Sequence, residues 1–365
     1  VSRGKTKNSI NLKEGFYVVT SAWILMGFFC ALPYFLSPYF TNFIDAFFES
    51  MSGITTTGAT IIGSNLGYSI EELPHGILFW RSFTQFIGGM GIILFTIAIL
   101  PILGMGGVQL FRAEVPGPST DKFTPRIKET AKYLWIIYLG LIFIETIVLY
   151  IEGIIFNIDK LTFFNSLCHS MTTISTGGFS TLNSSFSFFN SQKIESISIL
   201  FMIIGSLPFV VFLKFIHGDK KSIFQDDQIK LFFLILIFLI VITTLWLNKG
   251  LEIYDIKNSF RLSIFNITSI LTGTGYTNDN YNIWGGFGLV IMIIIMFIGG
   301  CAGSTTGGIK IVRIMLLFKA LKRELILVIH PRAVIKLRIG DKVLDEDLFR
   351  NVGVFFFIFV ILFLM

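Results

Sequence analysis

The sequence is poor in charged residues and in cysteine. Only 14% of its 365 residues are charged, whereas 53% are hydrophobic. About a quarter of a soluble globular chain is normally charged, so this composition excludes a soluble domain and indicates a membrane protein. The three cysteines, Cys30, Cys168 and Cys301, are far apart and form no CxxC pair. This spacing excludes a disulfide framework and a cysteine zinc site, and leaves the cysteines as small apolar packing residues.

Patterns of catalytic residues are also missing. The four histidines, His75, His169, His217 and His330, are scattered, with no HExxH motif and no pair at helical spacing. No nucleophile lies near a base in the sequence, so we expect no enzyme. A membrane enzyme acting on nucleotide or lipid phosphate is an alternative that alanine scanning of the histidines would reveal. His169 could face water behind a turn that follows it.

Long apolar runs recur along the chain in pairs. A membrane-spanning helix needs about 20 mostly apolar residues, and each pair encloses an amphipathic segment too short to cross. The predicted spans are residues 16–36, 74–102, 132–150, 197–215, 231–247 and the run from 283, and the short helices between them are residues 42–52, 161–173 and 259–271. The order span, short helix, span therefore occurs three times, which is typical of a repeated unit in an all-α membrane protein.

A turn rich in threonine and glycine follows each short helix. The turns read Thr55-Thr56-Thr57-Gly58, Ser175-Thr176-Gly177-Gly178 and Thr272-Gly273-Thr274-Gly275. Non-helical backbone at membrane depth is tolerated only where it is buried in protein or lines water. Carbonyl and hydroxyl oxygens can replace the hydration shell of K⁺, and glycine lets successive carbonyls face one side. We therefore predict that the turns converge into one ion filter; helix-capping loops in an inert bundle are the alternative.

The predicted filter can be assigned residue by residue. Its members are Thr56, Thr57, Gly58, Ser175, Thr176, Gly177, Gly273, Thr274 and Gly275, with K⁺ as the only metal expected there. Gly58, Gly177 and Gly275 recur at a spacing of about 100 residues, the length of one unit. A fourth such glycine would fall beyond Met365, and the apolar run 354–365 is shorter than a span. We expect the chain to be a fragment that ends inside a helix and lacks a fourth turn.

Another glycine-rich stretch interrupts the last long apolar run. Glycine costs about 1 kcal/mol relative to alanine inside a helix, so the helix should break here. The stretch follows a full-length apolar segment, which places it below the turns, where it could block or open the path; a plain kink is the alternative. The predicted gating residues are Gly299, Gly300, Cys301, Ala302, Gly303, Ser304, Thr305, Thr306, Gly307, Gly308 and Lys310. Lys310 and Arg313 could line this gate or anchor the chain at the inner interface.

Basic residues mark one side of the membrane. Most of the 29 Lys and Arg residues fall in segments 1–15, 103–133, 214–230 and 310–350, which are cytoplasmic if the turns enter from outside. The opposite side carries several acidic residues, which would concentrate cations at the mouth or are ordinary solvated charge. The predicted domains are an N-terminal cytoplasmic segment 1–15, repeat 1 at 16–102, a cytoplasmic loop 103–131, repeat 2 at 132–217, repeat 3 with a broken second span at 228–329, a cytoplasmic linker 330–351, and the start of repeat 4 at 352–365.

The turns and the glycine-rich stretch together resemble the Trk/Ktr/HKT superfamily of potassium transporters, and within it the bacterial TrkH-type pore-forming subunits. The resemblance is carried by residues 52–60, 174–180, 299–310, His330-Pro331-Arg332-Ala333-Val334, Gly88-Gly89-Met90-Gly91 and Phe111-Arg112-Ala113-Glu114. It covers nearly the whole chain. It departs from the family at Gly273, where the family often has threonine, and in lacking the family's first two helices, fourth turn and last span.

The resemblance implies an all-α polytopic membrane protein with tandem span–pore helix–span repeats around a pseudo-fourfold central pore in the bacterial inner membrane. It implies uptake of K⁺, the permeant ion, with no organic cofactor and with residues 299–310 as the gating loop. In the family a glycine in each turn accompanies K⁺ selectivity, and serine in the first turn accompanies Na⁺ permeation. The implied partners are membrane lipid, a second copy in a homodimer, and a cytosolic regulatory subunit that binds NAD- or ATP-type nucleotides; no nucleic acid is expected.

An ion-coupled symporter with alternating access is the main alternative function. In that mechanism broken helices bind substrate at the midplane and rock between states, with H⁺ or Na⁺ as the coupling ion. Three turns of one orientation favour a single filter instead. Acidic residues within the membrane are functional candidates by default. Asp45 and Glu49 could brace the filter or face its vestibule, and Glu145 is expected to pair within the bundle.

Overall fold

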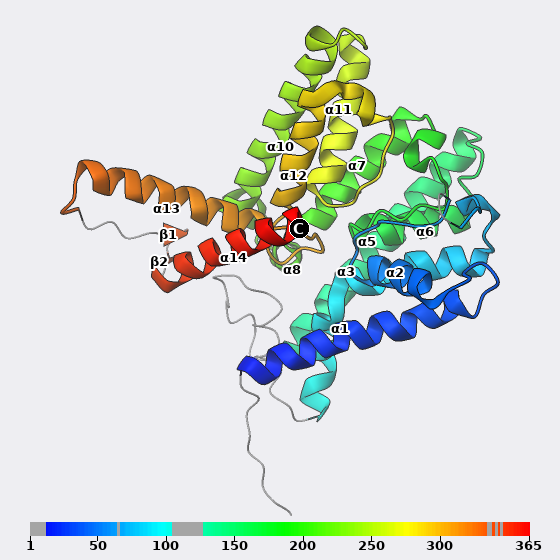
Figure 1. The fold of residues 1–365 in the computed structure, drawn as a ribbon, viewed down its shortest axis with the longest axis horizontal. Coiled ribbons are helices and arrows are strands. Elements are labelled where there is room, and N and C mark those ends of the chain that lie inside the picture. Colours follow the sequence, from blue (N-terminus) through cyan, green and yellow to red (C-terminus); the bar gives the residue numbers. More distant parts are fainter. Residues whose placement is uncertain (1–11, 64–65, 104–126, 334–337, 340–341, 344–345) are drawn as a thin grey trace, which may run out of the picture.

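The structure is a computed structural model that describes residues 12–63, 66–103, 127–333, 338–339, 342–343 and 346–365 (Figure 1). Most of the expected segments 1–15 and 103–131 lie outside the described residues. The same holds for the motif Phe111-Arg112-Ala113-Glu114 and for Val334.

Helices form most of the described chain and follow the same order three times. The first group is α1 (Leu12–Phe35), α2 (Phe43–Ile54) and α3 (His75–Leu103), and the second is α5 (Ile127–Ile155), α6 (Phe163–Ile174), α7 (Gln192–Ser206) and α8 (Phe209–Ile216). The third is α10 (Asp227–Leu245), α11 (Ile256–Leu271) and α12 (Gly285–Ile298), preceded by α9 (Ser222–Gln225). After them come α13 (Ile311–Ile329), the antiparallel pair β1 (Arg338–Ile339) and β2 (Lys342–Val343), and α14 (Glu346–Leu364). The expected all-α class is confirmed.

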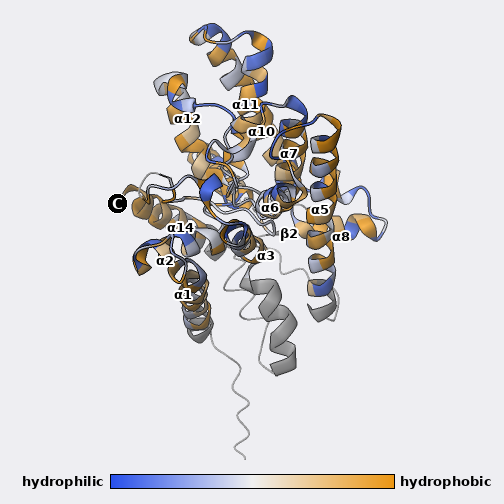
Figure 2. Cartoon of the chain, turned by 90° about the vertical axis from the view of Figure 1, so that its right-hand side faces the viewer, coloured by the Kyte–Doolittle hydropathy of each residue, from blue (hydrophilic) through white to orange (hydrophobic). Residues whose placement is uncertain are grey.

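Several helices are long and apolar enough to cross a membrane. Within the described residues four pass this test, and a bent pair of helices brings the number to 5. They are Tyr17–Phe35, Ala131–Ile155, Asp227–Gly250 and Tyr281–Ile298, with Gln192–Ser206 and Phe209–Ile216 as the pair. Hydrophobic residues predominate along these helices (Figure 2), and many of their large apolar side chains are exposed. Large exposed apolar surfaces are costly in water, so the chain is a multi-pass membrane protein.

Two predicted spans differ from straight helices. The span predicted at 197–215 is bent by 94° between α7 and α8. Pro208 cannot donate a backbone hydrogen bond and stands at this bend. The first amide of α8, Phe209 N, donates instead to Gly303 O at 3.0 Å. In α3, Gly91 has non-helical backbone with φ 65° and ψ 163°, which kinks the helix.

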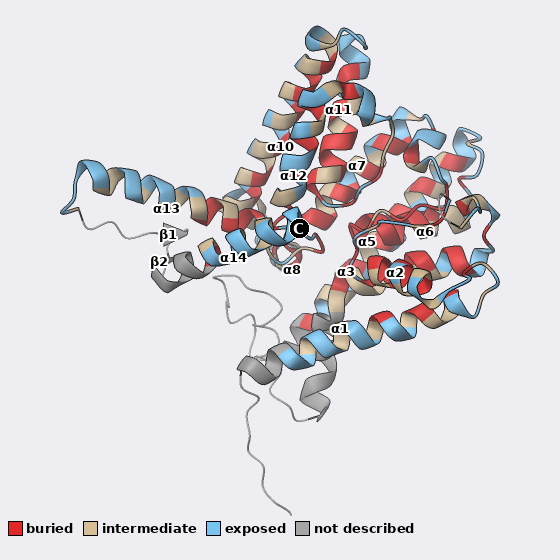
Figure 3. Ribbon diagram, viewed as in Figure 1, coloured by how far each residue is buried: buried red, intermediate tan, exposed pale blue. Residues whose placement is uncertain are grey.

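The short helices α2, α6 and α11 lie in the interior. α2 packs on α1 and α3, α6 on α5, α3 and α7, and α11 on α10, α7 and α12. Buried residues concentrate along these helices and in the turn that follows α6 (Figure 3). Polar N-caps start two of them: the side chains of Asn42 and Thr162 accept hydrogen bonds from Asp45 N and Asn165 N. Each short helix therefore enters the bundle and ends in a turn at its centre.

Candidate ion filter and gate

The three turns begin at the C-termini of the short helices and have the same backbone conformation. The C-cap residues are Thr55, Ser175 and Thr272. The next residue in each turn has a left-handed backbone, with φ 53° at Thr56, 53° at Thr176 and 73° at Gly273. Left-handed backbone is uncommon for threonine and costs free energy. The surrounding contacts, and not the local sequence, therefore impose this conformation.

A second left-handed residue is glycine in every turn. These residues are Gly58, Gly178 and Gly275, with φ of 77°, 75° and 85°. Their amides donate to carbonyls six residues earlier, those of Ser52, Thr172 and Ser269. Gly178 is therefore the counterpart of Gly58 and Gly275, and the sequence spacing that placed Gly177 there is wrong by one residue. Two adjacent glycines permit two alignments, and only the backbone geometry separates them.

The turns lie against one another. A Cβ atom added to Gly58 would overlap the carbonyl oxygen of Gly177 in the second turn. A Cβ atom on Gly178 would in the same way overlap Thr274 O in the third turn. Glycine is needed at both positions for its backbone conformation and for this close approach. The three turns thus converge in space, although more than 200 residues separate the first turn from the third.

Oxygen atoms are the polar groups that these turns offer to a ligand. Thr55 Oγ1 lies 2.8 Å from Thr57 Oγ1, and the equivalent pair Thr272 and Thr274 has the same separation. Within the described residues, no group of three or more His, Cys, Asp or Glu side chains could hold a metal ion. The donor set at the turns is made of carbonyl and hydroxyl oxygens, which suits a dehydrated monovalent cation.

One polar residue on each short helix supports the chain that leaves the turn. The equivalent residues are Glu49, His169 and Asn266, each three positions before Ser52, Thr172 or Ser269. Their partners are Thr60 (2.9 Å to Glu49 Oε1), Ser180 (3.0 Å to His169 Nε2) and Asn278 (2.6 Å to Asn266 Nδ2). All three supporting residues are buried. His169 is thus packed within the protein and does not face water.

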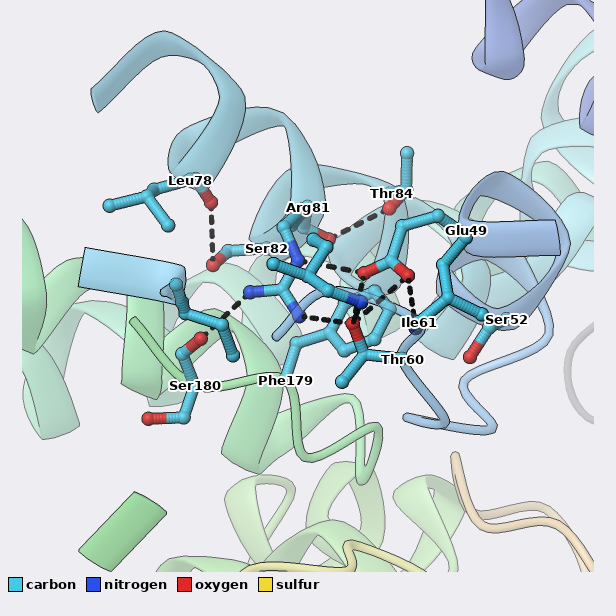
Figure 4. Close-up of polar contacts among 12 residues, drawn as sticks. Glu49, Ser52, Thr60, Ile61, Leu78, Arg81, Ser82, Thr84, Phe179 and Ser180 are labelled. Carbon is cyan, nitrogen blue, oxygen red and sulfur yellow. Dashed lines mark hydrogen bonds and ion pairs between the residues drawn. The ribbon is translucent and has the colours of Figure 1, made fainter. Parts of the chain in front are cut away.

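Glu49 has a second partner that the sequence did not indicate. Its Oε1 lies 2.9 Å from Nε of Arg81 on α3, and both side chains are buried (Figure 4). Arg81 Nη1 also donates to Ser180 O at 2.8 Å, beyond the second turn. Of the two roles left open for Glu49, bracing the turns is the one that its position supports. Asp45 is partly exposed and bonded to the N-cap Asn42.

Two further buried side chains hold the turns and were also missed. Gln85 Nε2 donates to Gly177 O at 2.8 Å, and Gln85 Oε1 accepts from Phe179 N at 3.0 Å. The Tyr276 hydroxyl, in the third turn, bonds to Thr173 Oγ1 (3.2 Å) and His169 O (3.1 Å) on α6. The only sequence signal was the i, i+4 spacing of Arg81 and Gln85 in an apolar run, which puts both on one helix face.

The glycine-rich stretch breaks the helix as predicted and lies beneath the second turn. α12 ends at Ile298 and α13 begins at Ile311. Cys301 N donates to Ser206 O at 3.0 Å, so the loop fits into the bend between α7 and α8. The Thr305 hydroxyl shares its hydrogen between Ile174 O (2.8 Å) and Gly205 O (3.0 Å), and its oxygen lies 3.4 Å from Thr176 Oγ1. The loop is therefore fastened directly to the second turn and its short helix.

A cavity of about 460 Å³ separates the first turn from this loop. It is lined by Thr55, Thr56, Gly88, Gly89, residues 303–308, Lys310, Arg313 and Phe355, among others. The Lys310 ammonium donates to the carbonyl and, at 3.1 Å, the hydroxyl of Thr306. The Arg313 guanidinium lies 4.0 Å from the centre of the Phe355 ring. Both cations face the cavity, which favours the gate-lining position over an interface anchor.

Glu145 on α5 is fully buried. Neither of its carboxylate oxygens has a hydrogen-bond partner among the described residues. The expected pairing of Glu145 within the bundle is therefore not found. The residues next to it in the sequence gave no indication that its carboxylate would be buried without a hydrogen-bond partner.

Comparison with known proteins gives a consistent result. The family described as "TrkH: Cation transport protein" matches residues 1–365. The chain is 39% identical over 368 residues to the Trk system potassium uptake protein TrkH of Salmonella typhimurium, covering 99% of this chain and 73% of that protein. It is 36% identical over 362 residues to TrkG of Escherichia coli, covering 98% and 72%. The crystal structure of the potassium transporter TrkH from Vibrio parahaemolyticus superposes with a TM-score of 0.82 at 35% identity, over 100% of this chain and 72% of that one.

Proposed function

The chain belongs to the TrkH family of cation transport proteins, and we propose that it carries K⁺ into the cell through a filter of backbone and threonine oxygens. The observation that carries this proposal is the convergence of the three turns, with Gly58 against Gly177 and Gly178 against Thr274. Converging carbonyls can replace the hydration shell of K⁺ without placing a full negative charge in the path. The relatives named as potassium uptake proteins support K⁺ as the transported ion.

The orientation of the short helices supports this mechanism of uptake. The C-termini of α2, α6 and α11 end at the turns, so the negative ends of their dipoles favour a cation there. The membrane potential supplies about 2.3 kcal/mol per charge for each 100 mV. In the proposal, the repeats surround a pseudo-fourfold central pore and have the bounds that the sequence predicts.

The loop 299–310 is the proposed gate. It is fastened beneath the second turn by Thr305, and its Lys310 ammonium occupies carbonyl and hydroxyl oxygens of Thr306 next to the cavity. A cation held in the path by the protein itself opposes entry of K⁺ by like-charge repulsion. Movement of the loop away from the turns would clear the path below the filter, which the cavity already reaches at Thr55 and Thr56.

Expression of the protein in a bacterium without its own K⁺ uptake systems tests the proposed function. We expect growth to be restored at low external K⁺, because selective uptake lets the membrane potential accumulate the ion. Gly58→Ser should raise Na⁺ influx relative to K⁺ by about tenfold or more, because the added side chain disturbs a ring of carbonyls. Influx of both ions, measured side by side in the same cells, gives the ratio.

The same cells separate a channel-like path from the symport alternative. Through an open filter, K⁺ influx depends only on the K⁺ gradient and the membrane potential. An obligatory dependence on an inward H⁺ or Na⁺ gradient would favour alternating access instead. Absence of any rescue by a protein that reaches the membrane would remove K⁺ uptake as the function.

The implied partners remain proposals that rest on the family resemblance. We propose a homodimer in the bacterial inner membrane and a cytosolic regulatory subunit that binds NAD- or ATP-type nucleotides. We expect the purified protein to have the mass of two chains in light scattering after subtraction of detergent. A single-chain mass at all protein concentrations would rule out a stable dimer.

A further inference from the structure

The ion pair of Glu49 and Arg81 is buried at the centre of the first unit. The exposed fractions of the two side chains are 0% and 2%. Removing two charges from water is costly, and a buried pair of this kind adds little to stability compared with apolar residues of the same size. The function of the pair is therefore sought in the groups that the two side chains hold in place.

Both members of the pair bind the segments that leave the filter turns (Figure 4). The Glu49 carboxylate accepts hydrogen bonds from Thr60 Oγ1 at 2.9 and 3.0 Å and from Ile61 N at 3.3 Å, just after the first turn. Arg81 donates from Nη1 to Ser180 O at 2.8 Å, just after the second turn. Its guanidinium also lies 4.2 Å from the centre of the Phe179 ring. The pair therefore spans two turns that belong to different units.

Gln85 continues this contact one helical turn further along α3. Its carboxamide bonds to Gly177 O and Phe179 N, the carbonyl and amide on either side of Gly178. Beyond it on α3, a Cβ on Gly88 would overlap Ile54 O at the end of α2, and one on Gly89 would come within 2.5 Å of Ser175 Cβ at the end of α6. α3 thus lies between the first two turns and contacts both.

We propose that Arg81, Glu49 and Gln85 are positioning residues for ion selectivity, because they set the separation of the first and second filter turns. This inference rests on the proposed function. Discrimination between K⁺ and Na⁺ depends on the spacing and number of oxygens around the ion, and functional oxygens must be held within about 0.5 Å. Glu49 has the added role of neutralising a guanidinium that would otherwise place a positive charge behind the filter.

A second ion pair in the same protein provides a matched control. Arg261 on α11 binds Glu195 on α7 through Nε–Oε2 and Nη2–Oε1 distances of 2.7 Å. It also joins two units, and its further hydrogen bond goes to Asn190 and not to a filter turn. Loss of this pair should affect stability or expression without changing ion preference.

The test compares three variants by the ratio of K⁺ to Na⁺ influx in proteoliposomes. Glu49→Gln keeps the side-chain volume but leaves Arg81 without a counter-charge. Gln85→Met keeps the length but leaves Gly177 O and Phe179 N without their partner. We expect the ratio to fall by about tenfold in each, the size of effect of a lost buried hydrogen bond. Glu195→Gln should keep the wild-type ratio.

The outcomes separate this inference from the proposed function. A wild-type ratio in Glu49→Gln and Gln85→Met, both eluting as folded protein, would overturn the inference while leaving K⁺ uptake intact. An equal fall in Glu195→Gln would also overturn it, because the effect would then be general destabilisation. If Glu49→Gln does not fold, Gln85→Met decides alone. Absence of K⁺ influx in the wild type would count against the proposed function itself.

Discussion

Replacing Gly178 with alanine is expected to lower K⁺ uptake on the order of a hundredfold, the equivalent of about 2.7 kcal/mol. Gly178 has φ 75°, a conformation that costs an alanine about 1–2 kcal/mol. The new methyl group would also overlap Thr274 O, and a backbone carbonyl cannot move aside cheaply. The displaced carbonyl belongs to the third turn, so one substitution disturbs two turns. Initial rates of K⁺ influx in cells with matched protein levels measure the effect.

Two other glycines provide the controls for this prediction. Gly67 has φ 74° and nothing within 4 Å of an added Cβ, so Gly67→Ala introduces the same backbone cost away from the turns. It should keep nearly wild-type uptake. Gly177 is not left-handed, and a Cβ there would meet the end of the Gln85 side chain and not backbone, so Gly177→Ala should lower K⁺ uptake less than Gly178→Ala. If Gly177→Ala is the more damaging of the two, the register assigned from the backbone is incorrect.

Loosening the glycine-rich loop is expected to increase K⁺ influx. Thr305→Val removes the hydroxyl that donates to Ile174 O and Gly205 O, the bonds that fasten the loop beneath the second turn. The hydroxyl has one hydrogen, which the two carbonyls share, so its loss removes about 1 kcal/mol and the population of the displaced loop should rise by roughly fivefold. Deletion of residues 303–307 should raise influx further. Influx into proteoliposomes at a fixed voltage, without a regulatory partner, is the appropriate measurement.

Ser304→Ala is the control for the loop. The Ser304 hydroxyl bonds to Cys301 O and Thr306 Oγ1 within the loop itself, so its loss does not release the loop from the turn. Influx in this variant should stay close to wild type. A fall in influx in folded Thr305→Val and in the deletion would show that the loop supports conduction and does not block it.

Local features of the sequence were sufficient for the fold class and for the order of the elements. Apolar runs of membrane length, short amphipathic helices, and turns rich in threonine and glycine are each encoded by neighbouring residues. The break at residues 299–310 follows from the poor helix propensity of glycine, and it was found between Ile298 and Ile311. Such features need no knowledge of distant contacts, which is why they could be predicted.

The tertiary structure alone decided the register of the second turn and the supports of the filter. Gly177 and Gly178 are the same residue type, and only the folded backbone shows that Gly178 is the left-handed one and lies against Thr274. Arg81 meets Glu49 from 32 residues away and Ser180 from 99. The bend at Pro208 depends likewise on the Gly303 carbonyl that replaces a helical partner. Packing between units fixes these contacts, and no periodicity within one unit encodes them.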